Sequence, residues 1–264
     1  MHIEKEKPQE GTDIKKVVAI MSGKGGVGKS SVTSLMAVSL QNKGYKVGIL
    51  DADITGPSIP KVFGIGEKRA VAIDNVIQPV ETTTGIKVIS INLMMDQEDS
   101  PVVWRGPLIA SMVKQFYTDV AWGELDYLLI DLPPGTGDVP LTIMQSLPVD
   151  GIVVVSCPQD LVQLIVKKSV NMARMMATPI YGLVENMSYF QCPDCDKKHY
   201  IFGESNIEEV AKEMDMEVLE KLPINQDFVT LCDEGRVEIF GKTYFGLCEQ
   251  LAEKLEERIG GMEK

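Results

Sequence analysis

A glycine-rich stretch near the N-terminus has the composition and spacing of a phosphate-binding loop. Residues 23–30 match the pattern GxxxxGK[ST], in which backbone N–H groups and a helix N-terminus surround phosphates. Lys29 is therefore expected to reach the β- and γ-phosphates of ATP, and Ser30 to ligate Mg²⁺. The expected nucleotide contacts of this loop are Gly23, Lys24, Gly25, Gly26, Val27, Gly28, Lys29, Ser30 and Ser31.

Carboxylates follow two apolar runs further along the chain. Asp51 and Asp53 come after the run 47–50, and Asp131 ends the run 127–130 in the Walker B form. Carboxylates at the carboxyl ends of parallel strands face the crevice where ligands bind. Asp131 is expected to hold Mg²⁺ through water, and a carboxylate at 51 or 53 to orient the attacking water or the magnesium shell. The alternative for Asp51 and Asp53 is a pair of turn-forming residues.

The segment after Asp131 predicts a nucleotide switch. Its residues 132–138, Leu-Pro-Pro-Gly-Thr-Gly-Asp, form a rigid turn in which Gly135 can bring its N–H close to the γ-phosphate. Ordering of such a loop by the γ-phosphate would distinguish ATP from ADP.

Cys192 and Cys195 form a CxxC pair, whose thiolates can grip one metal centre from a tight turn. The pair is incomplete, since tetrahedral zinc and a 4Fe-4S cluster each need four ligands. Two copies in a symmetric dimer would supply four thiolates. Zinc with His199 as a third ligand, a redox pair and an unmetallated loop are alternatives. The redox interpretation lacks a helix N-terminus to lower the thiol pKa, and the chemistry alone leaves zinc and iron-sulfur open.

The elements that would position these residues alternate between strands and helices. Five β-branched apolar runs lack polar alternation, as do strands buried on both faces of a parallel sheet: residues 17–21, 47–50, 127–130, 152–155 and 180–184. Helical patterns cover 30–41, 108–120 and 161–176. We predict an α/β fold, a doubly wound, mostly parallel β-sheet flanked by helices. A flexible segment, 1–15, precedes a single ATPase domain, 16–264.

Two helix boundaries are also predicted. Ser205 and Glu208 form a capping box that opens a helix running to about Met214, and Gly260 and Gly261 end the last helix. That last helix carries apolar residues at helical spacing, which predicts one face docked on the sheet.

Composition narrows the function classes. The formal net charge is −12 and no basic run occurs, which disfavours nucleic-acid binding. No apolar stretch reaches the length of a membrane span and no signal peptide is recognisable, so we expect a cytoplasmic protein without membrane contact. The odd number of cysteines, five, argues against a disulfide framework. Cys157, Cys232 and Cys248 are expected to be small buried hydrophobes.

The second lysine of the glycine-rich loop, Lys24, resembles the signature of the deviant Walker A ATPases, which include MinD, ParA, the nitrogenase iron protein and the Mrp family. The resemblance implies that Lys24 reaches the partner's nucleotide across a dimer interface. It also implies that Asp53 activates water with support from Asp51, that Asn186 contacts the adenine edge, and that Pro223 lies in the loop over the base. A lone Asn after a strand is otherwise a turn residue.

A longer set of motifs resembles the Mrp family of iron-sulfur cluster carrier ATPases: the glycine-rich loop, DADITGPSIP at 51–60, WRGP at 104–107, DLPPGTGD at 131–138, and ENMSYF, CPDC and IFG within 185–203. This resemblance implies a homodimer that holds a bridging 4Fe-4S cluster on Cys192 and Cys195. It also implies slow, magnesium-dependent ATP hydrolysis, cluster donors and cluster-accepting apo-proteins.

Two departures limit the resemblance. The N-terminus lacks the four-cysteine cluster motif of many members, and Asp196 stands where a glycine often follows the second cysteine. Two rival hypotheses remain: a MinD- or ParA-like positioning switch, which would bind membrane or DNA, and an NTPase with a structural zinc site.

Overall fold

The computed structural model describes residues 5–54, 56–95, 106–158 and 162–262. Within this part of the chain, nine strands form one sheet whose main path runs β10-β9-β8-β1-β7-β2-β6-β5, with β11 paired to β9. In that order the strands are β10 (Lys198–His199), β9 (Ile180–Gln191), β8 (Gly151–Ser156), β1 (Asp13–Ser22), β7 (Glu124–Asp131), β2 (Val47–Asp51), β6 (Lys87–Ile89), β5 (Val80–Glu81) and β11 (Val218–Pro223). A separate hairpin pairs β3 (Val71–Ile73) with β4 (Val76–Gln78).

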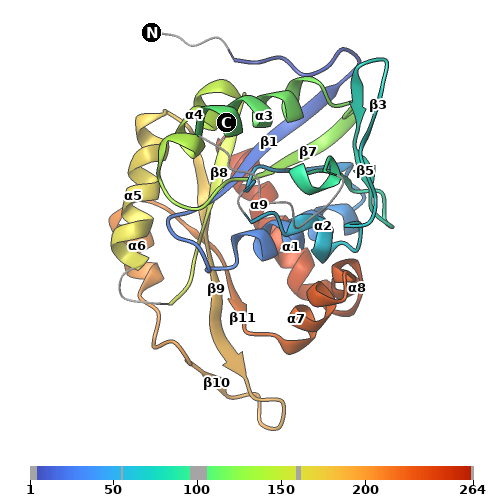
Figure 1. The fold of residues 1–264 in the computed structure, drawn as a ribbon. Helices are drawn as coiled ribbons and strands as arrows, with labels where there is room; N and C mark the ends of the chain where they lie inside the picture. Colours follow the sequence, from blue (N-terminus) through green and yellow to red (C-terminus); the bar gives the residue numbers. More distant parts are fainter. Residues whose placement is uncertain (1–4, 55, 96–105, 159–161, 263–264) are drawn as a thin grey trace.

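Helices flank the sheet (Figure 1). One group packs together through α1 (Lys29–Asn42), α8 (Val237–Thr243) and α9 (Phe245–Met262). Elsewhere α3 (Gly106–Thr118) packs on α4 (Asp138–Ser146), and α5 (Val162–Met175) packs on β8 and β1. The shorter helices are α2 (Ile59–Val62), α6 (Ile207–Glu213) and α7 (Gln226–Asp233), with a 3₁₀ turn at Ile91–Leu93. None of the described helices combines the length and apolarity that a bilayer-spanning segment requires.

The central strands confirm the predicted doubly wound sheet. Strands β8, β1, β7 and β2 run parallel, and all residues of β2 and β8 are buried. Their continuous aliphatic sequences suit a sheet covered on both faces. The register places Asp51 of β2 directly beside Asp131 of β7. The fold therefore brings together two carboxylates that lie far apart in the sequence.

The N-terminal boundary differs from the prediction. Strand β1 begins at Asp13, before the expected domain start at residue 16. Lys5 Nζ donates to the carbonyls of Met144 and Leu147 at 2.7 and 3.0 Å, which caps the carboxyl end of α4. The segment that precedes the first strand is therefore shorter than the predicted 1–15. The hydrogen bonds of Lys5, which the sequence did not predict, hold part of it against α4.

Three other boundaries differ. Helix α6 is present as predicted, but the capping box at its start was wrong. Ser205 Oγ accepts from the N–H of Ile207, and Glu208 forms an ion pair with Lys221 instead of closing the box. Helix α9 does not end at Gly260 and Gly261 but continues through both to Met262. Its predicted apolar face is buried. Strand β9 extends to Gln191, well beyond residue 184. Within the motifs quoted above, residues 55, 104 and 105 lie outside the described part.

Candidate functional site

The glycine-rich loop connects the central strand β1 to α1, the context that its motif requires. Gly26 and Gly28 have φ of +82° and +81°, a backbone region that favours glycine. A Cβ atom at Gly28 would also lie 2.1 Å from Nδ2 of Asn186. Glycine at position 28 is therefore required both by the backbone conformation and by close contact with β9.

Lys29 and Ser30 converge on Asp131 at the start of α1. The Lys29 side chain is only 5% exposed, and its Nζ lies 2.8 Å from Asp131 Oδ2 and 3.7 Å from Asp53 Oδ2. Ser30 Oγ donates to the same Asp131 oxygen at 2.6 Å. Hydroxyl and carboxylate oxygens are the hard ligands that Mg²⁺ prefers. The donor set at Ser30 and Asp131 therefore fits a magnesium ion.

Thr33, one turn further along α1, was not predicted as a site residue. Its Oγ1 donates to the second oxygen of Asp131 at 2.7 Å, while Ser30 holds the first. Residues three apart lie on the same helix face, so the spacing from Ser30 was an available signal. The two hydroxyls fix the orientation of a carboxylate that is fully buried.

Asp51 is a second buried carboxylate beside Asp131. Its Oδ1 accepts from the N–H of Asp53 at 3.2 Å, and its Oδ2 accepts from Ser90 Oγ at 3.0 Å. Burial, together with the negative charge of Asp131, raises the pKa of Asp51 to about 8. Ser90 was also missed, because nothing in the sequence places residue 90 beside β2.

This pKa shift predicts a pH dependence of stability. Unfolded Asp51 ionises near pH 3.8, whereas the folded carboxyl keeps its proton up to about pH 8. Its contribution to stability is therefore complete below about pH 4 and is lost as the pH rises to about 8. We expect Asp51→Asn to flatten the fall in unfolding free energy between about pH 5 and about pH 8, measured by urea titration. An unchanged slope in the variant would contradict this assignment.

The loop after Asp131 holds Gly135 against the end of β1. Gly135 has φ of +93°, and its N–H donates to the carbonyl of Ser22 at 2.8 Å. In this conformation the donor is directed at the end of β1, so presenting it to a γ-phosphate requires this bond to break. The expected switch stays a prediction.

Lys24 is half-buried at the start of the same loop. The Ser22 hydroxyl donates to its carbonyl at 3.0 Å. Burial raises the pKa of Cys157, and the positive charge of Lys24 opposes that rise, so the ammonium group lies near the end of β8. Its reach across a dimer stays a prediction.

Asn186 and Pro223 come together with Ser31 around one pocket, and their contact with a nucleotide base stays a prediction. Asn186 lies inside β9 rather than in a turn beyond it, and its Nδ2 donates to the carbonyl of Val27 at 3.0 Å. The remaining lining is mostly apolar and comprises Val32, Leu35, Leu222, Asn225, Phe228, Phe240 and Leu247.

The cysteine pair lies in the hairpin between β9 and β10, which projects from the end of the sheet (Figure 1). Cys192 is half-buried and Cys195 is exposed. The N–H of Asp196 donates to the Cys192 carbonyl at 2.9 Å, which closes the turn. Asp196 has φ of +57°, and this left-handed conformation gives a physical reason for glycine at that position. Gln191 Nε2 donates to the Asp196 carboxylate at 3.2 Å.

The turn itself favours the metal-binding form of Cys192. Hydrogen bonds from the backbone N–H groups of Asp194 and Cys195 lower the pKa of Cys192. The sequence argument against a redox pair was the lack of a helix N-terminus, but in the structure the turn supplies donors that lower this pKa without one. In the described residues, no group of three or more His, Cys, Asp or Glu side chains could hold a metal ion. His199 thus adds no third ligand here, and the two thiols make half a tetrahedral site.

Of the other three cysteines, two are buried as predicted and the third is more exposed than predicted. Cys157 and Cys248 are buried and Cys232 is half-buried. Burial raises the pKa of Cys248, and it raises that of Cys232 to about 11. All five cysteines are free thiols.

Solved structures share this architecture. The cell division ATPase MinD from Pyrococcus furiosus aligns with a TM-score of 0.67 at 20% identity, covering 92% of this chain and 99% of that one. This likeness shows the fold alone. A nucleotide-binding protein from Archaeoglobus fulgidus, solved in complex with ADP and with Co, aligns with a TM-score of 0.77 at 48% identity. The alignment covers 86% of this chain and 89% of that one.

Curated relatives are similar to the chain over most of its length. A protein named iron-sulfur cluster carrier protein from Clostridium perfringens is 51% identical over 233 residues, covering 86% of this chain and 82% of the relative. Its namesake from Methanocaldococcus jannaschii is 49% identical, covering 84% and 77%. The model of the ParA family described as NUBPL iron-transfer P-loop NTPase matches residues 13–257. The chain therefore belongs to the NUBPL iron-transfer P-loop NTPase family.

Proposed function

We propose that this chain is an ATP-dependent iron-sulfur cluster carrier. A homodimer would hold a labile 4Fe-4S cluster between two Cys192/Cys195 pairs and transfer it to apo-proteins. The observation that carries the proposal is the half-complete thiol site on a projecting hairpin, in a chain that also has a phosphate-binding loop. Two symmetry-related hairpins supply the four thiolates that such a cluster needs. Relatives named iron-sulfur cluster carrier protein support the same function.

The nucleotide site would control the carrier as a slow, magnesium-dependent ATPase. Lys29 would bind the β- and γ-phosphates in exchange for its contacts with Asp131 and Asp53. Ser30 and Asp131 would hold Mg²⁺, which neutralises developing charge during phosphoryl transfer. Asp53, at the mouth of the same site, would orient the attacking water. The adenine would lie in the pocket of Asn186 and Pro223.

Five free thiols suit a reducing compartment, and we infer that the protein works in the cytoplasm. Its partners would be cluster donors and cluster-accepting apo-proteins. The positioning-switch hypothesis has the shared fold in its favour, whereas the net charge of −12 disfavours binding to DNA.

Anaerobic reconstitution with iron and sulfide tests the proposal. We expect about four irons per dimer, a matching amount of sulfide and a broad absorbance band near ~400 nm. Transfer to an apo-ferredoxin should then depend on the nucleotide. Stoichiometric zinc without a cluster would contradict the carrier function and support an NTPase with a structural metal.

A further inference from the structure

Strand β9 connects the nucleotide site directly to the cysteine hairpin. Asn186 contacts the phosphate-binding loop through its bond to the Val27 carbonyl, and its side chain packs closely against Gly28. Cys192 follows at the end of the same strand. A bound nucleotide that displaces Asn186 would therefore move the same strand that leads into the two cysteines.

Glu185, the neighbour of Asn186, is a buried carboxyl group that the proposed ATPase chemistry does not use. It is 2% exposed. Its Oε2 accepts from Ser188 Oγ at 2.6 Å, and its Oε1 accepts from Ser205 Oγ. Ser188 lies on the outgoing strand of the hairpin, and Ser205 lies on the returning segment. We call these three residues the Glu185 clamp, because one side chain ties both ends of the hairpin to the sheet.

The backbone between the clamp and the nucleotide contact is irregular. Met187 has φ of +56°, although a bulky side chain disfavours this left-handed region by about 1 kcal/mol. The pairing of β9 with β11 also shifts register here, from Glu185 opposite Lys221 to Tyr189 opposite Pro223. Such strain persists only where surrounding contacts impose it. Asn186 on one side of Met187 and Ser188, a member of the Glu185 clamp, on the other side supply those contacts.

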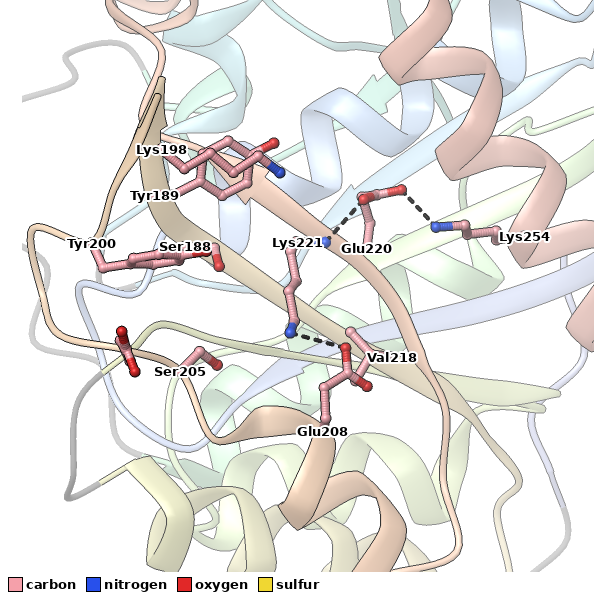
Figure 2. Close-up of a pocket in the computed structure, with 11 residues that line it drawn as sticks. Ser188, Tyr189, Lys198, Tyr200, Ser205, Glu208, Val218, Glu220, Lys221 and Lys254 are labelled. Atoms are coloured by element: carbon pink, nitrogen blue, oxygen red, sulfur yellow. Dashed lines mark hydrogen bonds and ion pairs between the residues drawn. The ribbon is translucent and has the colours of Figure 1, made fainter. Parts of the chain in front are cut away.

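Other ties at the base of the hairpin are more exposed. Ser188 and Ser205 line a pocket together with Tyr189 and Tyr200 (Figure 2). On its other wall, Lys221 pairs with Glu208 and Lys254 with Glu220, all partly exposed. Exposed ion pairs contribute little to rigidity, whereas buried hydrogen bonds to a carboxylate are costly to break. The clamp is therefore the strongest polar tie around this pocket.

We propose that the Glu185 clamp positions the CxxC hairpin and transmits the nucleotide state from Asn186 to Cys192 and Cys195. Glu185 is a positioning residue, since it acts through the hairpin. When the phosphate-binding loop moves with its ligand, Asn186 and the kink at Met187 follow, and the clamp makes both strands of the hairpin move together. This inference rests on the proposed function, in which nucleotide binding controls the cluster.

Thiol labelling tests the clamp without requiring a cluster. The full-length, metal-free protein is treated with a maleimide in the presence of ADP or a non-hydrolysable ATP analogue, and labelling of Cys192 and Cys195 is followed by peptide mass spectrometry. In the wild type we expect the two nucleotides to change the labelling rate by about fivefold or more. In Ser205→Ala the two rates should become nearly equal. Ser205→Thr, which keeps the hydroxyl, should restore the difference.

Two further variants make the result specific. Glu185→Gln keeps the shape but weakens both bonds, so it should reduce the nucleotide effect even if Ser205→Ala folds poorly. Thr243→Ala removes an exposed hydroxyl that donates only to the Ile239 carbonyl, and it should behave as wild type. Nucleotide affinity should be unchanged in all four variants, because none of these side chains lines the nucleotide site.

Two results would overturn the inference. One is an undiminished nucleotide effect in both Ser205→Ala and Glu185→Gln. The other is a wild-type protein whose cysteines react equally with either nucleotide. Failure of the proposed function is distinguishable, because it would appear in reconstitution as absent iron whatever the labelling shows.

Discussion

Replacing both hairpin cysteines, Cys192→Ala/Cys195→Ala, is expected to abolish cluster binding, from about four irons per dimer to background. Each subunit offers one pair of thiols and no third ligand in the described residues, so nothing compensates for their loss. The variant should still fold, because Cys195 is exposed and Cys192 half-buried. Its ATP turnover should stay within about twofold of wild type, since the two sites share no side chain.

Iron, sulfide and zinc analysis of the reconstituted dimer, with the visible spectrum, measures this effect. Cys232→Ala is the matched control, because it removes one half-buried thiol outside the hairpin. Burial raises the pKa of Cys232 to about 11, which makes it a poor ligand near neutral pH, so this variant should keep its cluster. A cluster that survives in the double variant would refute the ligand assignment.

Lys24→Ala is expected to lower ATP turnover by about 10³-fold, the lower range for removing a cation that stabilises phosphoryl transfer across an interface. Nucleotide affinity should change little, because Lys29, Ser30 and the base pocket remain. Steady-state turnover and a nucleotide titration separate the two quantities. Unchanged turnover would contradict a catalytic role for this lysine.

Mixed dimers show whether Lys24 acts on its own nucleotide or on its partner's. Lys24→Ala and Lys29→Ala subunits should each be inactive alone. In a mixed dimer, the Lys24→Ala subunit keeps its own Lys29 and receives Lys24 from the partner. A 1:1 mixture should therefore recover about a quarter of wild-type turnover, since about half of the dimers are mixed and each has one working site. No recovery on mixing would place Lys24 in its own subunit's site.

Local motifs made much of the site predictable from the sequence. The phosphate-binding loop has fixed spacing between a strand and a helix, and Asp131 ends an unmistakably apolar strand, so both were assigned directly. Thr33 and Ser90 were missed for different reasons. Thr33 needed only the helical spacing from Ser30, whereas Ser90 reaches Asp51 through the order of strands β6 and β2, which no local pattern encodes.

Strand β9 shows where pattern reading fails. Its first residues are aliphatic and were predicted, but Glu185, Asn186 and Ser188 interrupt the apolar run, and the prediction stopped there. The structure explains these polar residues, because each makes a specific hydrogen bond that a sequence does not display. The positive φ of Met187 breaks the strand's alternation as well. The part of β9 that leads into the cysteine turn was consequently not predicted.

The surroundings of Lys29 have a consequence for which form of ATP the site selects. The ammonium group of Lys29 contacts the carboxylates of Asp131 and Asp53, while Asp51 beside them stays protonated near neutral pH. A triphosphate that takes Lys29 as its counterion leaves these carboxylates facing a polyanion in a buried setting, where like charges repel strongly. A divalent cation removes that repulsion, so metal and nucleotide each raise the affinity for the other by the same factor. Charge balance thus favours binding of the magnesium complex of ATP over binding of the free nucleotide.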